Sequence, residues 1–526
     1  MKTLSAATLD DEDTGHPNKW MIAVAVALGA LLEVVDTSIV NVALTNMRNA
    51  FGATLTQVSW VVSSYAVANV IILPLTAWLG NRYGKKRYFV WSLIGFTVAS
   101  MLCGLAPNLP ILIAARIFQG IMGGGLLAKA QAILFENFPK REQAAAQGFF
   151  AIVVIAGPSI GPTLGGWLTT NVSWRWIFYI NVPIGIAAVM MCIAMLPPDK
   201  AAKDTRPVDW TALGMLAIGL GCLQTFLEEG QSEQWFESPF IIILASIALV
   251  SIVLFIDRQL SSNAPIVDLR ILRYRSLWAG SILSIIVGMA LYGALFAIPI
   301  FAQTVLGYSA QQTGMLLLPS ALMSAAMMPI AAKLVNRLDP RVMLIMGMVV
   351  LIASIKVLGV MSPMTGEPNM FWPMMLRSVG TAFMFIPLSM ATLGPIPKRD
   401  ISAASGFYNL TRQLGGSIGV ALLSTLLERR EAFHHAIIVE KLSSSDPQVV
   451  ARVAMYTNRF LAAGYTGPDA TAHAHKLLDM GVSAQAAVIS FGDCFWATSI
   501  LVACTIPLVF LLGKPPAKNV KLDAGH

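Results

Sequence analysis

Residues 73–87 read Leu-Pro-Leu-Thr-Ala-Trp-Leu-Gly-Asn-Arg-Tyr-Gly-Lys-Lys-Arg. This stretch joins the end of an apolar run (residues 57–79) to a short loop that holds two glycines and a basic block. A second apolar run (residues 88–106) follows at once. Each run is long enough to cross about 30 Å of hydrocarbon as a helix, and the glycines permit a tight turn between them. The stretch therefore predicts two membrane spans joined by a short basic hairpin.

Apolar runs of similar length recur along the whole chain. They lie near residues 20–44, 57–79, 88–106, 111–135, 144–168, 175–196, 208–227, 239–256, 277–301, 312–335, 342–361, 370–393, 404–427 and 489–512. Only 12% of the 526 residues are charged and 56% are hydrophobic, whereas a soluble domain is charged at about a quarter of its positions. We predict an all-α polytopic membrane protein with fourteen transmembrane helices.

The sequence of residues 73–82 is partly repeated later in the chain. Residues 328–337 read Met-Pro-Ile-Ala-Ala-Lys-Leu-Val-Asn-Arg, and Pro, Asn and Arg align with those of residues 73–82 at one constant offset. Parallel repeats of this kind occur in one large transporter architecture. The spans then group as six, two and six. The predicted organisation is an N-terminal tail (1–19), an N-terminal six-helix half (20–196), a linker with two additional helices (197–257), a C-terminal six-helix half (258–512) with an outer loop (428–488), and a C-terminal tail (513–526).

The basic residues set the orientation. They gather in the connections that follow the even-numbered spans, for example Lys85, Lys86 and Arg87 after the second span. By the positive-inside rule these connections lie in the cytoplasm, and so do both termini. The net charge of +8 does not indicate nucleic acid, because no basic stripe is interleaved with aromatic residues. The cysteines show no paired spacing, so neither a disulfide framework nor a metal site is expected.

Span 1 carries an unusual polar strip. Glu33 and Asp36 are three residues apart and so share a helix face, and Thr37 and Asn41 extend that face. A carboxylate at bilayer depth is costly unless it faces a cavity or binds a proton. We expect Glu33 and Asp36 to bind protons, although a structural ion pair or a hydrogen-bonded strut would use the same residues.

Other polar residues inside the spans are candidates for the same chemistry. Arg116 in span 4 needs a counter-charge, and Asp36 is its natural partner. Lys129 and Lys356 lie close enough to span ends for their amines to reach the membrane surface. Candidate residues of a substrate cavity are Thr37, Asn41, Gln119, Arg377, Asn409 and Arg412.

Two glycine-rich motifs indicate movement. In span 5, Gly157, Gly161 and Gly165 recur every fourth residue and allow close helix packing, while Pro158 and Pro162 each delete a backbone hydrogen bond. We expect a hinge or a tight seal between the two halves there. The loop after span 2 contains Gly80, Asn81, Arg82 and Gly84 in a tight turn, which is consistent with a conformational latch.

Together these motifs resemble the major facilitator superfamily, and within it the fourteen-span drug:proton antiporters of the EmrB/QacA type. The likeness runs from about residue 20 to residue 512. It implies that Asp36 and Arg116 couple protonation to a rocking of the two halves about a central cavity, and that spans 7 and 8 are peripheral. Asn81 departs from the family pattern, in which an aspartate is common, so a latch here is weakened or built differently.

The resemblance implies a proton-coupled antiporter of the bacterial inner membrane that exports lipophilic drugs or related small molecules. Its partners would be substrate, protons and membrane lipids, with a periplasmic adaptor and an outer-membrane channel at the long outer loop. An exporter or importer of a specific metabolite, such as a siderophore or a fatty acid, remains open, as does a receptor or scaffold. No nucleophile, cofactor loop or nucleotide-binding loop indicates an enzyme.

Overall fold

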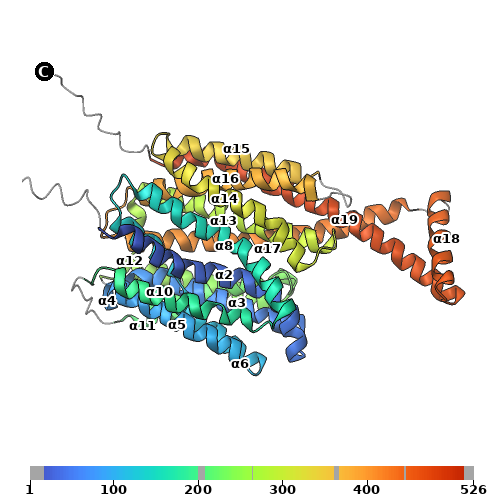
Figure 1. Ribbon diagram of the computed structural model, residues 1–526, viewed down its shortest axis with the longest axis horizontal. Coiled ribbons are helices and arrows are strands. Elements are labelled where there is room, and N and C mark those ends of the chain that lie inside the picture. The colour runs from blue at the N-terminus through green and yellow to red at the C-terminus, as the bar shows by residue number, and fades with distance from the viewer. Residues whose placement is uncertain (1–16, 200–207, 264, 361–366, 443–445, 514–526) are drawn as a thin grey trace, which may run out of the picture.

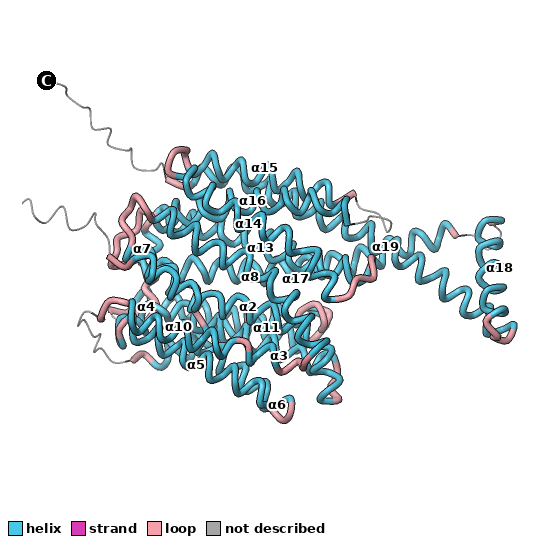
Figure 2. Tube along the Cα trace, viewed as in Figure 1, coloured by secondary structure: helices cyan, strands magenta, loops and turns pink. Residues whose placement is uncertain are grey.

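The computed structural model describes residues 17–199, 208–263, 265–360, 367–442 and 446–513. Within these ranges the chain is helical and contains no strand (Figure 2). The long helices lie side by side in one elongated bundle (Figure 1). The first helix begins and the last span ends at the same end of this bundle, which we call the Lys19 end, and α18 marks the opposite end.

The N-terminal half contains the first six spans. Three of them are each assembled from more than one helical piece, because Pro74 interrupts the second, Gly124 and Gly125 interrupt the fourth, and a short helix opens the sixth. The elements are α2 (Lys19–Phe51), α3 (Leu55–Ile72), η1 (Leu73–Leu75), α4 (Thr76–Tyr83), α5 (Lys85–Leu105), α6 (Leu109–Gly123), α7 (Leu126–Asn137), α8 (Gln143–Asn171), α9 (Trp176–Tyr179) and α10 (Asn181–Met195).

Two further helices, α11 (Trp210–Glu229) and α12 (Pro239–Ser261), form the additional pair, with η2 (Trp235–Glu237) between them. They pack on each other, and α11 also contacts α3 and α17. Only 17% of the most apolar window of α12 is buried, so this helix lies at the periphery of the bundle. The predicted boundary after residue 257 falls inside α12, which continues to Ser261.

The C-terminal half repeats the arrangement of the first. It contains η3 (Leu269–Arg273), α13 (Arg275–Thr304), α14 (Ala310–Val335), α15 (Pro340–Leu358), α16 (Glu367–Leu393), α17 (Ile401–Lys441), α18 (Pro447–Ala462), α19 (Gly467–Thr505) and η4 (Ile506–Leu511). Its fifth span, α17, packs along its first span, α13, as α8 packs along α2 in the N-terminal half. The two halves meet along α8 and α14.

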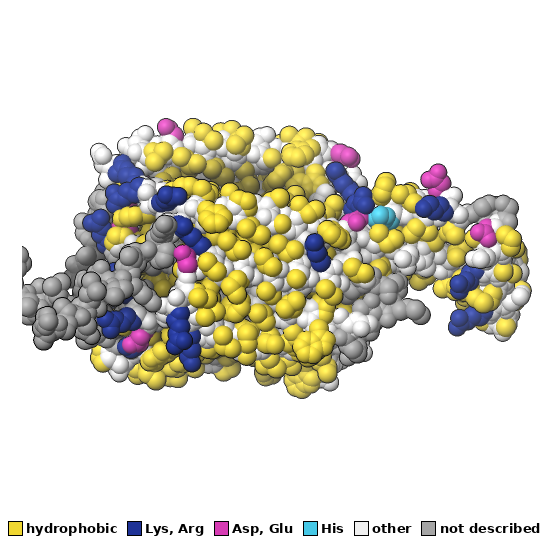
Figure 3. Space-filling model, turned by 90° about the horizontal axis from the view of Figure 1, so that it is seen from above, with side chains coloured by type: hydrophobic (Ala, Val, Ile, Leu, Met, Phe, Trp, Pro, Cys, Tyr) yellow, Lys and Arg dark blue, Asp and Glu magenta, His cyan; other side chains and the backbone are white. Residues whose placement is uncertain are grey.

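The spans agree with the expected transmembrane count. Among the described residues, thirteen helical segments are long and apolar enough to cross a membrane. The remaining predicted span, the thirteenth (404–427), lies inside α17, which is more polar because it carries residues such as Asn409 and Arg412. Hydrophobic side chains cover the middle of the bundle, and Lys and Arg side chains gather mostly towards its ends (Figure 3).

The predicted outer loop (428–488) is largely helical in the described residues. α17 continues to Lys441 and α19 begins at Gly467, so both helices extend beyond the bundle and carry α18 between them (Figure 1). α18 begins one residue after its N-cap Asp446, whose side chain accepts a hydrogen bond from the Gln448 backbone N–H. We call the part from 428 to 488 the protrusion.

Candidate functional site

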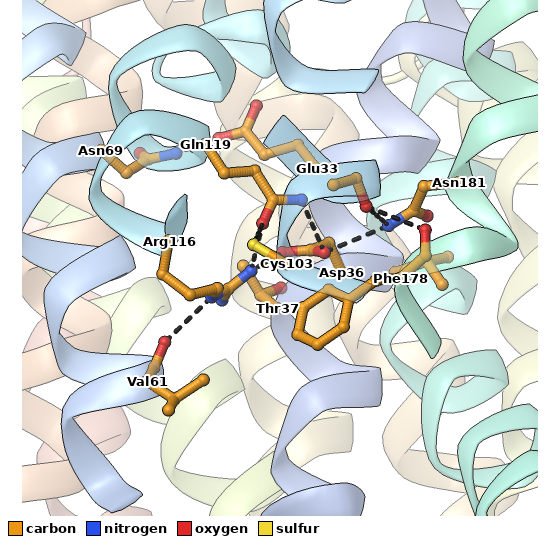
Figure 4. Close-up of polar contacts among 12 residues, drawn as sticks. Glu33, Asp36, Thr37, Val61, Asn69, Cys103, Arg116, Gln119, Phe178 and Asn181 are labelled. Carbon is orange, nitrogen blue, oxygen red and sulfur yellow. Dashed lines mark hydrogen bonds and ion pairs between the residues drawn. The ribbon is translucent and has the colours of Figure 1, made fainter. Parts of the chain in front are cut away.

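Asp36 lies in the middle of α2 and is completely buried. Its Oδ2 accepts a hydrogen bond from Arg116 Nη1 at 2.6 Å, and its Oδ1 accepts from the amides of Gln119 at 3.0 Å and Asn181 at 3.1 Å (Figure 4). The ion pair expected between spans 1 and 4 is therefore present. Asp36 ties together helices α2, α6 and α10, so its charge bears on the placement of all three.

Arg116 is equally constrained. Its Nε donates to the Val61 carbonyl oxygen at 2.9 Å, and its Nη1 also donates to Gln119 Oε1 at 2.7 Å. The Tyr65 ring lies over the guanidinium, with its centroid 4.2 Å from Cζ. Removing one partner of a buried ion pair leaves an uncompensated charge, which costs about 3–5 kcal/mol. The state of Asp36 therefore decides how firmly α6 holds to α2 and α3.

Glu33 lies one turn away from Asp36 in a different environment. It is 7% exposed, and its Oε1 accepts from Asn69 Nδ2 at 2.9 Å. Its Oε2 accepts from the Leu127 backbone N–H at 2.8 Å. Both hydrogen bonds come from neutral donors, and no ion pair joins Glu33 to another residue in the described part of the chain.

The donor from Leu127 exists because span 4 is broken. Gly125 has φ of 76°, and a Cβ there would lie 2.1 Å from Thr76 Cγ2, so only glycine fits this turn. The break starts a new helix, α7, whose first N–H groups have no acceptor within the helix. The positive end of that helix is aimed at Glu33.

Thr37 and Asn41, two of the cavity candidates, lie on the exposed face of α2. Thr37 Oγ1 donates to the Val34 carbonyl oxygen at 2.8 Å, and Asn41 Nδ2 donates to the Thr37 carbonyl oxygen at 3.1 Å. In both bonds the side chain is the donor, and among the described residues nothing donates to Thr37 Oγ1 or Asn41 Oδ1. Gln119, by contrast, is buried in the Asp36 network.

Asn409 and Arg412 belong to a second polar network, between the two halves. Gln131 on α7 donates to Gln147 Oε1 at 3.1 Å and to Ser389 Oγ at 3.0 Å. Gln131 Oε1 accepts from Asn409 Nδ2 at 2.7 Å and from Ser405 Oγ at 3.3 Å. Arg412 Nη2 in turn donates to Asn409 Oδ1 at 2.6 Å. We call Gln131, Gln147, Ser389, Ser405 and Asn409 the inter-half cluster.

This cluster lies near the Lys19 end. Gln147 and Ser405 are each four residues after the start of a helix, and Ser389 is four residues before the end of one. Five hydrogen bonds join residues 20–196 to residues 258–512 here, and each involves a member of the cluster. The two halves are therefore bonded to each other at the Lys19 end.

The glycines of span 5 form a seam against α2. A Cβ on Gly157 would lie 2.8 Å from Val34 Cγ1, and a Cβ on Gly161 would lie 1.9 Å from Ser38 Oγ and 2.9 Å from the Ile39 nitrogen. A Cβ on Gly165 would lie 3.1 Å from the Ile39 carbonyl oxygen. Pro158 and Pro162 lie inside this single helix. The seam seals α2 to α8 within the N-terminal half, while α8 packs on α14 across the halves.

The loop after span 2 contains a carboxylate from elsewhere in the chain. Asp199, which follows α10, accepts hydrogen bonds from the backbone N–H groups of Lys86 at 2.8 Å and Arg87 at 3.2 Å. Gly84 has φ of 95°, and a Cβ there would lie 2.3 Å from Asp199 Oδ2. Gly80, Asn81 and Arg82 belong to the last turns of α4, before this loop; Asn81 is exposed there, and Arg82 lies over the Trp78 ring. Asp199 thus supplies a negative group to this loop, next to the helix end that has an asparagine at position 81.

Several residues of these networks gave no signal in the sequence. Asn69, Asn181 and Gln131 are neutral side chains inside apolar runs, and nothing in their spacing shows which helix they face. The expectation for Lys129 was wrong. Its amine is buried, donates to Ser92 Oγ at 2.8 Å and lies 3.8 Å from the centre of the Tyr88 ring, because α7 turns that face towards α5.

Two packed six-helix halves with buried charges near the middle of their helices are typical of a membrane transporter. Residues 26–420 match the family model described as "Major Facilitator Superfamily". The chain is 33% identical over 501 residues to the multidrug export protein EmrB of Escherichia coli (strain K12), covering 94% of this chain and 95% of the relative. It is 33% identical over 495 residues to the fatty acid resistance protein FarB of Neisseria gonorrhoeae, covering 94% and 96%.

Solved structures show the same fold. A double-tryptophan mutant of XylE superposes with a TM-score of 0.60 at 13% identity, covering 95% of this chain and 97% of that one. The human organic anion transporter MFSD10 (TETRAN) superposes with a TM-score of 0.56 at 13% identity, covering 93% and 100%. The chain belongs to the Major Facilitator Superfamily, and its relatives place it with the EmrB-like drug-efflux transporters.

Proposed function

We propose that this protein is a proton-coupled antiporter that exports lipophilic drugs or related small molecules by alternating access. The observation that carries the proposal is the buried Asp36–Arg116 ion pair, with the carboxylate of Glu33 one turn away. Each inward proton crossing is worth about 2.3 kcal/mol per 100 mV of membrane potential. A transporter needs a buried group that can accept this proton, and α2 carries two.

The two carboxylates divide the work of coupling. Protonation of Asp36 removes the charge that holds Arg116 Nη1, so α6 is released from α2. Protonation of Glu33 removes the charge that the Leu127 N–H at the start of α7 stabilises, with no direct ion pair to break. Both changes loosen span 4 against span 1. Because Gln131 of the inter-half cluster also lies on α7, loosening of this helix reaches the contact between the halves.

The location we propose is the bacterial inner membrane, with both termini in the cytoplasm. The basic connections at the Lys19 end support this orientation. The inter-half cluster then closes the cytoplasmic side, and the protrusion lies in the periplasm. We further propose that the protrusion contacts a periplasmic adaptor that leads to an outer-membrane channel. Exposed apolar side chains on α18, such as Val450 and Met455, support a partner there.

A narrower substrate is the second candidate. The relative FarB is named for fatty acid resistance, and the chain is as similar to it as to EmrB. An exporter of one lipophilic acid would use the same coupling residues. The two candidates differ in substrate range, so a panel of cationic dyes and fatty acids separates them.

The test is dye efflux from energised cells. Asp36→Asn should abolish efflux, since a group that cannot lose its proton cannot cycle, and Glu33→Gln should impair it. A protonophore should stop efflux by the wild type. Glu142→Gln is the matched control, because Glu142 is a half-exposed acid that pairs with Lys19 at the bundle surface. Efflux by Asp36→Asn at the wild-type rate, unaffected by the protonophore, would refute the coupling.

A further inference from the structure

A small pocket lies at mid-depth between the two halves. Ile155 of α8 contributes one wall, Leu291 of α13 another, and Ser320 and Ser324 of α14 face Arg377 of α16. These residues lie near the middle of their helices. Transporters built from repeats bind substrate at this depth, where the two repeats meet.

Arg377 has no counter-charge. Its side chain is 6% exposed, and its Nε is buried without an acceptor. No hydrogen bond or ion pair joins its guanidinium to any residue that the structure describes, and the lining of the pocket contains no acid. Arg116 in the other half shows the contrast, because Asp36 and a backbone carbonyl satisfy it. A guanidinium keeps its proton in proteins, and a buried cation of this kind is expensive without a partner. The missing partner is an anion.

One further donor faces the same space. The hydroxyl of Ser320 donates to the Leu317 carbonyl oxygen, and that of Ser378 donates to the Ser320 carbonyl oxygen. Ser324 is 4% exposed, and among the described residues its hydroxyl has no hydrogen-bond acceptor. A planar guanidinium together with a free hydroxyl matches the acceptor oxygens of a carboxylate.

We propose that Arg377 and Ser324 bind the carboxylate of an exported organic acid, with the apolar part of that molecule against Ile155 and Leu291. This proposal rests on the proposed function, because it names a substrate class for the same transporter. The free volume here is about 10 Å³, which is room for about one water molecule. Ile155 belongs to the N-terminal half and the other lining residues to the C-terminal half, so separation of the halves at this depth widens the pocket.

The division of charge between the halves follows. Protons bind to Glu33 and Asp36 in the N-terminal half, whereas the substrate anion binds in the C-terminal half. The substrate therefore does not compete with the proton for one carboxylate. The two are instead exchanged through the movement of the halves. A permanently charged Arg377 selects anions at any pH at which the protein is folded.

The experiment measures binding of 2-naphthoate to the purified full-length protein in nanodiscs by isothermal titration calorimetry, with the neutral 2-naphthamide as the uncharged probe of the same shape. The wild type should bind 2-naphthoate more tightly than 2-naphthamide. Arg377→Gln should weaken binding of 2-naphthoate about 10- to 100-fold and leave 2-naphthamide unchanged. Arg377→Lys should fall between the two, and Ser324→Ala should weaken 2-naphthoate only a few-fold. Lys356→Gln, an exposed cation on α15, is the matched control and should bind as the wild type does.

Three results would overturn the proposal: no saturable binding of 2-naphthoate to the wild type, no preference for it over 2-naphthamide, or undiminished binding to Arg377→Gln. Ser324→Ala keeps the test decisive if Arg377→Gln does not fold, because its loss is confined to the hydroxyl. The binding assay needs no gradient, so it fails or succeeds separately from the coupling. If 2-naphthoate binding depends on Arg377 but efflux does not depend on protons, the antiporter proposal is refuted and the anion site is kept.

Discussion

Replacing Gln131 by alanine should release the two halves from each other at the Lys19 end. The Gln131 side chain uses all four of its hydrogen-bonding positions, and three of these bonds cross to Ser389, Ser405 and Asn409 in the other half. When the halves separate, hydrogen bonds to water replace these bonds. The cluster therefore stabilises only the arrangement in which the halves are closed at the Lys19 end. At about 1 kcal/mol net for each crossing bond, Gln131→Ala removes about 3 kcal/mol, or about 100-fold in the equilibrium between closed and open.

Double electron–electron resonance measures the distance between spin labels at Lys140→Cys and Lys398→Cys, and this distance reports the equilibrium between closed and open. Both residues are exposed at the Lys19 end, one in each half, and the native cysteines are replaced in the background. Gln131→Ala should shift the distance distribution from short to long. Gln143→Ala is the matched control, since Gln143 is also buried but donates only to the carbonyl oxygens of Phe135 and Phe138 in its own half. An unchanged distribution in Gln131→Ala, or an equal shift in Gln143→Ala, would refute this role of the cluster.

Two other changes test the seam and the protrusion. Gly161→Ala should lower the free energy of unfolding of the purified protein by about 1–3 kcal/mol, because the added Cβ meets the Ile39 backbone. Gly214→Ala is the control and should cost nothing, since nothing lies within 4 Å of a Cβ there. Equal losses in the two variants would contradict the seam. Replacing α18 by a short linker should abolish drug resistance in a host with an outer membrane but leave transport in proteoliposomes intact. Resistance that survives the replacement, or transport that is lost in both systems, would count against an adaptor contact.

The spans and the central ion pair were predictable, for different reasons. A span is decided by a run of apolar residues, which is a local property that the sequence displays directly. The Asp36–Arg116 pair was predictable because a charge at mid-depth needs an opposite charge and few are available. The break at Gly125 was not predicted, since the helix resumes after one turn and the apolar run continues across it.

The inter-half cluster and the helical protrusion could not be predicted from the sequence, for a different reason in each case. Gln131 and Asn409 are neutral amides, and only the packing of α7 against α17 shows that they meet. For the protrusion, the polar composition of residues 428–488 indicated a loop. Residues 428–441 contain neither glycine nor proline, and so α17 simply continues as a helix to Lys441.

The length of α17 has a mechanical consequence. This one helix of 41 residues carries Ser405 and Asn409 of the inter-half cluster near its start and ends at Lys441 in the protrusion. At about 1.5 Å per residue it is a rod of roughly 60 Å, and a tilt of about 10° at its base would carry its tip through about 10 Å. A protein docked on the tip would be moved whenever the halves rock. The helix would then act as a lever that moves the docked protein once in each transport cycle.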